Sequence, residues 1–301
     1  MKRIKGLIVA PFTAFKNDGF VDLQKVKEQE DFYRRNGAAG AFVCGTTGEG
    51  SALTMQEKKS LFKEWGRVKH DGFTVIGFLG GTCLEEEKEL AKYAVECGLD
   101  AVAVTAPYYQ KPADVDTLSM CCAEVAAAAS EIPFFYYHIP CLTNVGFPMR
   151  SLLEKMDAEI PNLAGIKYTF EDLSDYQLCL EFKERKYNIL WGRDEMLLPA
   201  LSIGASGFVG STYGYCSRGN NMIIEKFNSG QIEEAAKLQL TSNRLITLLG
   251  KYGSGSGKAF MKAAGLDLGP CRLPLQTMSR ETYISFTEEL KRLDFDSMKN
   301  Q

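Results

Sequence analysis

Ala101-Val-Ala-Val-Thr-Ala106 is a short, almost wholly apolar run that lies between two segments with helical periodicity, Leu84–Glu96 and Leu118–Ala129. A strand that is buried on both faces of a parallel sheet has this continuous apolar character, whereas a half-exposed strand alternates apolar and polar residues. The order helix, strand, helix therefore predicts a parallel sheet whose strands are joined by helices.

The same unit recurs along the chain, and eight apolar runs qualify as strands. They are Gly6–Thr13, Ala41–Thr46, Thr74–Leu79, Ala101–Ala106, Pro133–Ile139, Leu163–Tyr168, Asn188–Gly192 and Gly207–Gly210. Further helices are expected over Val21–Arg35, Met55–Lys69, Leu173–Lys186 and Met222–Phe227. Thr54 and Glu57 have the spacing of a capping box at the start of the second of these. Eight strand–helix units predict an α/β fold of the (β/α)8 TIM-barrel type.

A doubly wound open sheet is the competing fold. Such a sheet usually has a glycine-rich fingerprint after its first strand, and Pro11-Phe12-Thr13 stands there instead. We therefore expect residues 1–230 to form the barrel. Residues 231–301 are expected to form a C-terminal helical extension that packs on the barrel as part of a single structural unit.

The composition excludes several classes of protein. The 301 residues are 45% hydrophobic and 24% charged, which excludes a disordered chain and a coiled coil. The formal net charge of −3 argues against a nucleic-acid partner, because such proteins usually have a basic excess. Nine cysteines without a C-x-x-C pair favour reduced thiols and a cytoplasmic location.

Two long uncharged stretches, Ile132–Met149 and Met196–Ser217, are interrupted by prolines or glycines. Their length alone would allow a membrane span. The interruptions instead favour buried strands and turns, so we expect no membrane partner. The apolar run before Pro11 is also too short for a secretory signal.

The active site of a TIM barrel lies at the carboxyl ends of its strands. Polar residues that end the apolar runs are therefore the candidate site residues. They are the loop Gly45–Gly50 with Thr46 and Thr47, then Tyr108, Tyr109, Tyr137, His138, Lys167, Thr169, Gly192, Arg193, Asp194, Glu195, Ser211 and Thr212.

Lys167 is the most informative of these residues. It sits near the end of the apolar run Leu163–Tyr168, where partial desolvation disfavours the charged amine and lowers its pKa. A neutral amine attacks a ketone to form a Schiff base. On position alone, however, a lysine that reaches the rim or binds an anion explains the residue at least as well.

The other candidates also have two explanations each. Tyr137 suits proton relay beside an amine, although on position alone a core aromatic with a satisfied hydroxyl is the better explanation. The Gly45–Gly50 loop offers backbone N–H groups to a carboxylate, but glycine-rich strand ends are often only turns. Asp194 and Glu195 suit binding of substrate hydroxyls, and acids in the first turn of a helix look the same.

The two histidines exclude other chemistry. His70 and His138 lie far apart in the sequence and cannot supply the several histidines of a zinc-dependent aldolase. His70 lies beside a predicted helix end and is expected to be exposed. The chain also lacks the G-x-S-x-G elbow of a Ser-His-Asp hydrolase. These exclusions favour a lysine-based mechanism without a metal.

Several motifs occur together and in a familiar order. They are Gly45-Thr-Thr-Gly-Glu-Gly50, Tyr136-Tyr-His-Ile-Pro140, Gly165-Ile-Lys-Tyr-Thr169, Gly192-Arg-Asp-Glu195 and Gly210-Ser-Thr-Tyr213. With this set, the chain resembles the N-acetylneuraminate lyase and dihydrodipicolinate synthase superfamily of pyruvate-dependent aldolases over almost its whole length. The resemblance implies a (β/α)8 barrel, a Schiff-base lysine, no organic cofactor and usually a homotetramer.

The resemblance also implies roles for individual residues. Lys167 matches the Schiff-base lysine and Tyr137 the proton-shuttling tyrosine. Thr46 and Thr47 match the pair that holds the pyruvate carboxylate. Tyr109 matches a tyrosine that, in the synthases, joins a proton relay across a subunit interface. The positions that bind the sugar chain in the lyases are matched by Thr169, Gly192, Asp194, Glu195 and Ser211.

The resemblance favours the lyase branch. The synthases have an arginine that grips a second carboxylate, and Leu142 occupies that place here. Thr46 is the synthase form, yet animal lyases share it. Asn144, where lyases often have glycine, leaves the sugar preference open. We therefore expect a class I aldolase that cleaves N-acetylneuraminate to N-acetyl-D-mannosamine and pyruvate.

Two other functions stay open at this point. One is a sibling pyruvate-dependent aldolase, namely a dihydrodipicolinate synthase or a 2-keto-3-deoxy sugar acid aldolase. The other is a pseudoenzyme that only binds a keto acid or a sugar.

Overall fold

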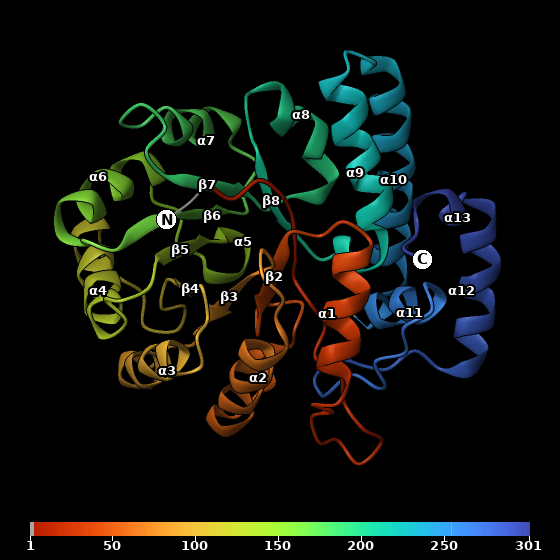
Figure 1. Ribbon diagram of the computed structural model, residues 1–301, viewed down its shortest axis with the longest axis horizontal. Coiled ribbons are helices and arrows are strands. Elements are labelled where there is room, and N and C mark those ends of the chain that lie inside the picture. Colours follow the sequence, from red (N-terminus) through yellow and green to blue (C-terminus); the bar gives the residue numbers. More distant parts are fainter. Residues whose placement is uncertain (1–2, 254) are drawn as a thin grey trace.

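Eight parallel strands close into a barrel in the computed structural model, which describes residues 3–253 and 255–301 (Figure 1). The strands are β1 Gly6–Val9, β2 Gly40–Val43, β3 Thr74–Phe78, β4 Ala101–Thr105, β5 Phe134–His138, β6 Leu163–Tyr168, β7 Asn188–Trp191 and β8 Gly207–Gly210. Each strand pairs with its neighbours in sequence, and β8 pairs with β1 to close the ring. The predicted TIM barrel is confirmed, and the open sheet is excluded.

Helices surround the ring and extend beyond it at the carboxyl terminus of the chain. The barrel helices are α1 Lys25–Arg35, α2 Met55–Val68, α3 Leu84–Glu96, α4 Val115–Ala128, α5 Pro140–Thr143, α6 Met149–Glu159, α7 Leu173–Leu180, α8 Leu197–Ser202 and α9 Tyr213–Asn228. Two 3-10 turns, η1 Gly50–Ala52 and η2 Asp194–Met196, follow β2 and β7. The remaining helices are α10 Ile232–Tyr252, α11 Ser256–Ala263, α12 Arg280–Arg292 and α13 Phe295–Met298.

Local sequence rules account for several helix ends. Thr54 and Glu57 form the expected capping box at the start of α2. Helix α1 begins at Lys25 and not at Val21, because Val21 pairs with Phe15 in an isolated antiparallel bridge. Helix α7 stops at Leu180, ahead of a turn in which three successive residues have positive φ angles, so the prediction that it reaches residue 186 was wrong.

The two uncharged stretches are only partly strands and turns. The first contains β5 but also the short helix α5, and α6 starts at its last residue, Met149. The second contains β8, but also α8 and the start of α9. The sequence did not predict these helices, because a buried helical turn and a buried strand have the same apolar character over a few residues. No helix in the described ranges is long and apolar enough to span a membrane.

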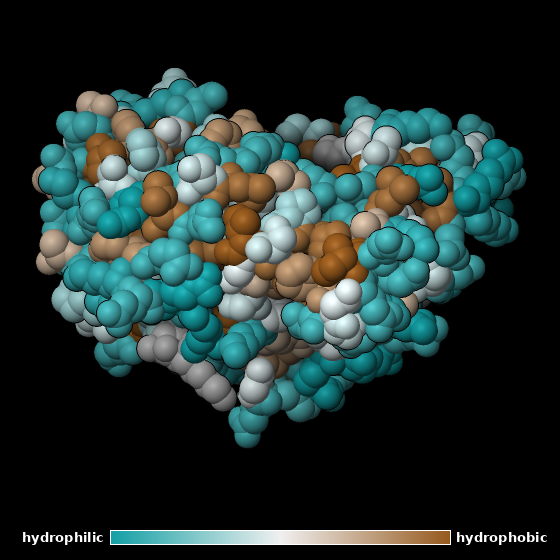
Figure 2. Space-filling view, turned by 90° about the horizontal axis from the view of Figure 1, so that it is seen from above, coloured by the Kyte–Doolittle hydropathy of each residue, from teal (hydrophilic) through white to brown (hydrophobic). Residues whose placement is uncertain are grey.

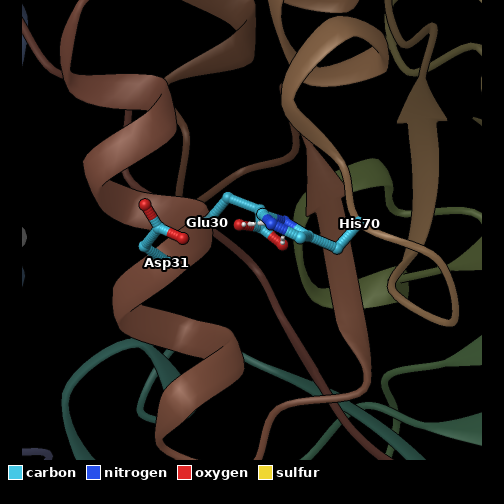
Figure 3. Close-up of side chains that lie close together, drawn as sticks. All are labelled: Glu30, Asp31 and His70. Atoms are coloured by element: carbon cyan, nitrogen blue, oxygen red, sulfur yellow. Dashed lines mark hydrogen bonds and ion pairs between the residues drawn. The ribbon is translucent and has the colours of Figure 1, made fainter.

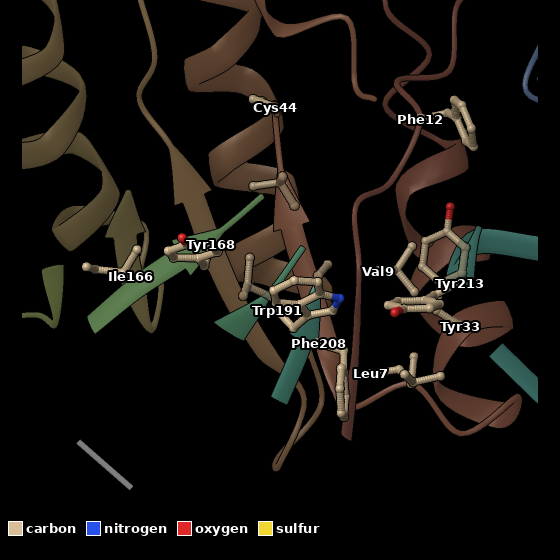
Figure 4. Close-up of a cluster of buried hydrophobic side chains, with 14 of the residues drawn as sticks. Leu7, Val9, Phe12, Tyr33, Cys44, Ile166, Tyr168, Trp191, Phe208 and Tyr213 are labelled. Carbon is tan, nitrogen blue, oxygen red and sulfur yellow. The ribbon is translucent and has the colours of Figure 1, made fainter. Parts of the chain in front are cut away.

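Buried side chains form two separate layers because successive residues of a strand point to opposite faces. The outer layer lies between the strands and the helices, as Figure 4 shows for residues such as Leu7, Tyr168 and Trp191. The rings of Tyr168 and Trp191 stack there at 6.1 Å between centroids. The inner layer fills the barrel and includes Phe42 and Tyr137. Lys167 shares the inward direction of Tyr137, which is its register partner on β5.

The C-terminal helices pack against the last barrel helix. Helix α10 lies alongside α9, and α12 and α13 lie beyond them at the edge of the molecule (Figure 1). Asn300 fixes the end of the chain, because its side-chain amide donates to the carbonyl of Gly214 at 2.9 Å. One contact of α10 concerns the site directly, since Ile246 and Leu249 of this helix line the cavity at the barrel mouth.

Candidate active site

A cavity of about 250 Å³ opens at the carboxyl ends of the strands. It brings together eleven of the candidate residues, which follow or belong to β2, β5, β6, β7 and β8. They are Thr46, Thr47, Tyr137, Lys167, Thr169, Gly192, Arg193, Asp194, Glu195, Ser211 and Thr212. The side chains that the motifs place far apart in sequence therefore share one site, as expected for a barrel of this class.

Lys167 points into this cavity from β6 and is only 4% exposed. Its Nζ lies 3.8 Å from the ring centroid of Tyr137 and 4.1 Å from that of Phe42. Burial lowers the pKa of the Lys167 amine to about 7, and the Asp194 carboxylate opposes that shift. Within the described ranges, no carboxylate lies within ion-pair distance of Nζ. A large share of this amine is therefore neutral near pH 7.

Aromatic rings form the floor beneath the lysine. Phe42, Phe78 and Tyr137 contact one another with centroid separations of 5.7, 5.4 and 5.5 Å. The rings of Phe42 and Tyr137 offer the Lys167 amine only weak cation–π contacts. The sequence did not identify Phe42 or Phe78 as site residues, because each looks like an ordinary core phenylalanine of an apolar strand.

Tyr137 is buried and lines the same cavity. Burial raises the pKa of Tyr137 to about 12, and the nearby hydroxyl groups of Thr46 and Thr169 oppose the rise. The resting phenol is therefore protonated at neutral pH. A proton relay through this group has to give up one proton as it accepts another.

The Gly45–Gly50 loop carries Thr46 and Thr47 over the cavity between two residues in the left-handed region. Cys44 has φ 60° and Glu49 has φ 56°, which is unusual for residues with a side chain. A Cβ atom at Gly50 would lie 1.8 Å from the carbonyl oxygen of Cys44, so only glycine fits there. The loop is thus a tightly bent segment whose shape the surrounding structure maintains.

Asp194 is buried and held by Thr212. Its Oδ2 accepts hydrogen bonds from the Thr212 backbone N–H at 2.9 Å and from the Thr212 hydroxyl at 2.7 Å. Burial raises the pKa of Asp194 to about 6, against the effect of those hydrogen bonds. A Cβ atom at Gly210 would lie 1.9 Å from Oδ1, so the glycine at the end of β8 makes room for this carboxylate.

Gly192 has a similar role beside Thr169. A Cβ atom at Gly192 would lie 2.0 Å from the Thr169 hydroxyl oxygen. That hydroxyl is buried and has no hydrogen-bond partner in the described part of the chain. It is therefore a polar group at the cavity wall that a bound substrate hydroxyl would satisfy.

Glu195 lies at the half-exposed rim in an ion pair with Arg193. The Arg193 guanidinium is 2.9 Å from the Glu195 carboxylate and also pairs with Glu171. Arg193 lines the cavity as well. The sequence placed it between two candidate acids, but only the structure shows that it fixes the position of one of them.

A second cavity, of about 320 Å³, adjoins the first and shares Thr46, Tyr137 and Ile139 with it. Tyr108, Leu142 and Lys58 line this second space. Tyr109 does not line either cavity, and its side chain is 86% exposed. Among the candidate residues beyond the Gly45–Gly50 loop, Tyr109 and His138 are thus the two that line neither cavity.

The histidines lie outside the cavity. His138 is buried against Tyr168 and Phe170, and burial lowers its pKa to about 4. His70 is half-exposed and contacts Glu30 of α1 at 3.0 Å, as Figure 3 shows. Glu30 and its neighbour Asp31 also pair with Arg34. The three groups in Figure 3 thus form part of an ion-pair network that already contains its own cation.

Comparison with known proteins agrees with this geometry. The model of the Dihydrodipicolinate synthetase family matches residues 3–293, and the chain belongs to this family. The chain is 39% identical to the N-acetylneuraminate lyase of Pongo abelii, over 98% of this chain and 94% of that protein.

Two solved structures are also similar. The N-acetylneuraminate lyase of Proteus mirabilis superposes with a TM-score of 0.95 at 32% identity, covering 98% of this chain and 100% of that one. The enzyme of the same name from Aliivibrio salmonicida gives a TM-score of 0.95 at 33% identity, with 98% of each chain covered.

Proposed function

We propose that this protein is a class I aldolase that cleaves N-acetylneuraminate to N-acetyl-D-mannosamine and pyruvate. The observation that carries the proposal is the Lys167 amine, buried over aromatic rings at the carboxyl ends of the strands, with a pKa of about 7. The names of the relatives supply the substrate, and the cavity supplies polar groups on one side of the lysine for a hydroxylated chain.

In the first step the neutral Lys167 amine attacks the C2 ketone of the open-chain sugar acid. Loss of water gives an iminium ion that draws electrons from the C3–C4 bond. The electron pair of that bond forms the C2–C3 double bond of an enamine, and C4 becomes the aldehyde carbon of N-acetyl-D-mannosamine. Protonation of the enamine at C3 and hydrolysis then release pyruvate and the free lysine. The iminium is the electron sink, so this route needs no metal or organic cofactor.

Tyr137 handles the proton of the C4 hydroxyl in this mechanism. Its raised pKa keeps the phenol protonated at rest, so the phenol passes its own proton to the substrate carboxylate as it takes the hydroxyl proton. Thr46 and Thr47 of the bent loop hold that carboxylate. Thr169, Gly192, Asp194, Glu195 and Ser211 lie along the wall where the sugar hydroxyls are expected to bind.

The protein is also proposed to act as a homotetramer in the cytoplasm. Support for assembly comes from the exposed apolar side chains Tyr109 on the β4–α4 loop, Leu178 on α7 and Leu240 on α10. Figure 2 shows that hydrophobic residues gather in a central band on one face of the molecule, between hydrophilic areas. Light scattering on the purified protein measures the assembly, and a monomer at micromolar concentration would contradict it.

A coupled assay for pyruvate release tests the proposed reaction. N-acetylneuraminate is compared with several 2-keto-3-deoxy sugar acids at equal concentration, and the highest kcat/KM is expected for N-acetylneuraminate. No pyruvate from N-acetylneuraminate, together with turnover of another acid, would favour the sibling aldolase. No turnover of any acid and no borohydride-trapped adduct on Lys167 would leave only a binding function.

A further inference from the structure

A second buried lysine, Lys258, lines a different cavity from the one around Lys167. Lys258 of α11 is 5% exposed, and its Nζ forms an ion pair of 2.8 Å with Oε1 of Glu49. Glu49 belongs to the Gly45–Gly50 loop that carries Thr46 and Thr47. The pair therefore joins the C-terminal helices to the loop that is proposed to hold the substrate carboxylate.

The backbone of Glu49 determines the shape of this loop. Its φ angle of 56° reverses the chain, and its N–H donates to the carbonyl of Thr46 at 3.1 Å. The Thr13 hydroxyl donates to the carbonyl of the neighbouring Gly48 at 2.6 Å. A non-glycine residue keeps such a conformation only when its surroundings compensate for the strain. The side chain of Glu49 makes the contacts with the C-terminal segment, outside the loop, that hold this conformation.

Both carboxylate oxygens of Glu49 are held by the C-terminal segment. Oε2 accepts the backbone N–H of Arg272 at 2.7 Å, and Oε1 pairs with Lys258. Lys258 also donates to the carbonyl of Pro270 at 2.6 Å, and its Nζ lies 4.4 Å from the centroid of the Phe15 ring. The Pro270 carbonyl and the Phe15 ring thus hold the Lys258 amine in place, and the amine in turn holds the Glu49 carboxylate.

We propose that Lys258 is a positioning residue for the carboxylate-binding loop, and that it selects ketones with an adjacent carboxylate by keeping Thr46 and Thr47 in place through Glu49. It acts on the binding of the substrate carboxylate and not on the Lys167 amine. The inference rests on the proposed function, because it assumes that this loop binds the carboxylate of a keto acid.

Borohydride trapping on Lys167 separates the two effects. The purified protein is titrated with pyruvate or with methyl pyruvate, its neutral ester, and the reduced adduct is measured by mass spectrometry. Lys258→Met is expected to raise the half-saturating concentration of pyruvate about tenfold. A factor of this size corresponds to weakening one charge-assisted hydrogen bond between the loop and the substrate carboxylate. The value for methyl pyruvate is expected to change by less than about twofold, since the ester offers no carboxylate to the loop.

Lys262→Met is the matched control. Lys262 lies one turn further along α11, and its Nζ pairs with the exposed Asp267 at 2.9 Å instead of with the loop. This variant is expected to trap both ketones like the unmodified protein. Glu49→Gln serves as the second test variant if Lys258→Met does not fold, and the same selective loss for pyruvate is expected from it.

An equal shift for pyruvate and methyl pyruvate, or no shift for either, would overturn the positioning role while leaving the Schiff-base lysine in place. Absence of any adduct in the unmodified protein would instead overturn the proposed function and this inference together. The pair of ketones therefore tells the two failures apart.

Discussion

Lys167 and Lys258 are two lysines of the same chain that are almost equally buried, and their surroundings differ in one respect. The Nζ of Lys258 has a carboxylate at 2.8 Å and a carbonyl at 2.6 Å. The Nζ of Lys167 lies over two aromatic rings, and no carboxylate within the described ranges reaches ion-pair distance. Burial lowers the pKa of both amines; the hydrogen-bonded Glu49 carboxylate opposes this at Lys258, whereas at Lys167 the opposing Asp194 carboxylate is not in ion-pair contact.

The difference shows that burial alone does not make a lysine reactive. An ammonium that is desolvated but paired stays charged and holds structure, because its partner repays much of the cost. An ammonium that is desolvated without a close partner loses its proton near neutral pH and becomes a nucleophile. The five predictions below test this contrast.

Lys167→Ala is expected to give the largest effect. It removes the only group proposed to form the imine, so pyruvate release from N-acetylneuraminate should fall by at least about 10⁴-fold. The coupled assay measures the rate, and circular dichroism checks the fold. Residual activity within about tenfold of the unmodified protein would show that Lys167 does not carry the reaction.

Lys258→Met is expected to destabilise the protein by about 3–5 kcal/mol, since it leaves the Glu49 carboxylate buried without its cation. Lys167→Met is expected to keep or raise stability, because it replaces a poorly solvated amine by an apolar chain next to aromatic rings. Urea unfolding at pH 7 measures the free energy of unfolding of both variants.

The exposed ion pair of Lys262 with Asp267 is the control for a surface contact. The free energy of unfolding of Lys262→Met should lie within about 0.5 kcal/mol of that of the unmodified protein. If the two buried lysines gave equal losses, the contrast between them would fail.

Tyr137→Phe is expected to lower kcat by about 10²–10³-fold with a smaller change in KM, because the hydroxyl moves a proton in the bond-breaking step and contributes less to binding. Steady-state kinetics with N-acetylneuraminate measures the split. The Lys167 adduct with pyruvate should still form, because imine formation does not require the phenol. A rise in KM at constant kcat would assign Tyr137 to substrate binding alone.

The rate of imine formation should depend on pH near neutrality. With a Lys167 pKa of about 7, the neutral fraction of the amine rises about tenfold between pH 6 and pH 8. Borohydride trapping with pyruvate at short times should rise accordingly and level off above that range. A rate that still increases steeply above pH 9 would indicate an amine with an ordinary lysine pKa.

Asp194→Asn is expected to give the smallest effect of the five, a shift in the pH dependence of borohydride trapping on Lys167. The Asp194 carboxylate favours the charged form of Lys167, so its removal should move the acid limb of the trapping rate to lower pH. The asparagine side-chain oxygen can still accept the Thr212 N–H, which preserves the local structure. A shift to higher pH would contradict the electrostatic coupling between these two residues.

The barrel was predictable from sequence because a strand that is buried on both faces is a continuous apolar run of a few neighbouring residues. Each strand is a short apolar run, and Asn188–Trp191 or Gly207–Gly210 can be found without knowledge of the partner strand. The helices α6 and α8 were missed because they occur in or beside apolar stretches where strand and helix look alike. The capping box of Thr54 and Glu57, in contrast, is a short-range pattern and was recognised.

The positions of the candidate site residues could also be predicted, since strand ends of a closed parallel barrel must meet at one mouth. Eleven of the candidates line one cavity, whereas the exposed Tyr109 does not. The aromatic floor of Phe42 and Phe78 was not predicted, because these residues have the same sequence signature as any core phenylalanine.

The sequence by itself determined the alternation of strands and helices, the strand that carries Lys167 and the family motifs around it. These features depend on neighbours along the chain, so local patterns encode them. Only the tertiary structure decided that the Lys167 amine meets aromatic rings while the Lys258 amine meets Glu49. Those environments arise from residues that are distant in sequence, and the pKa of a buried charge depends on what surrounds it in space.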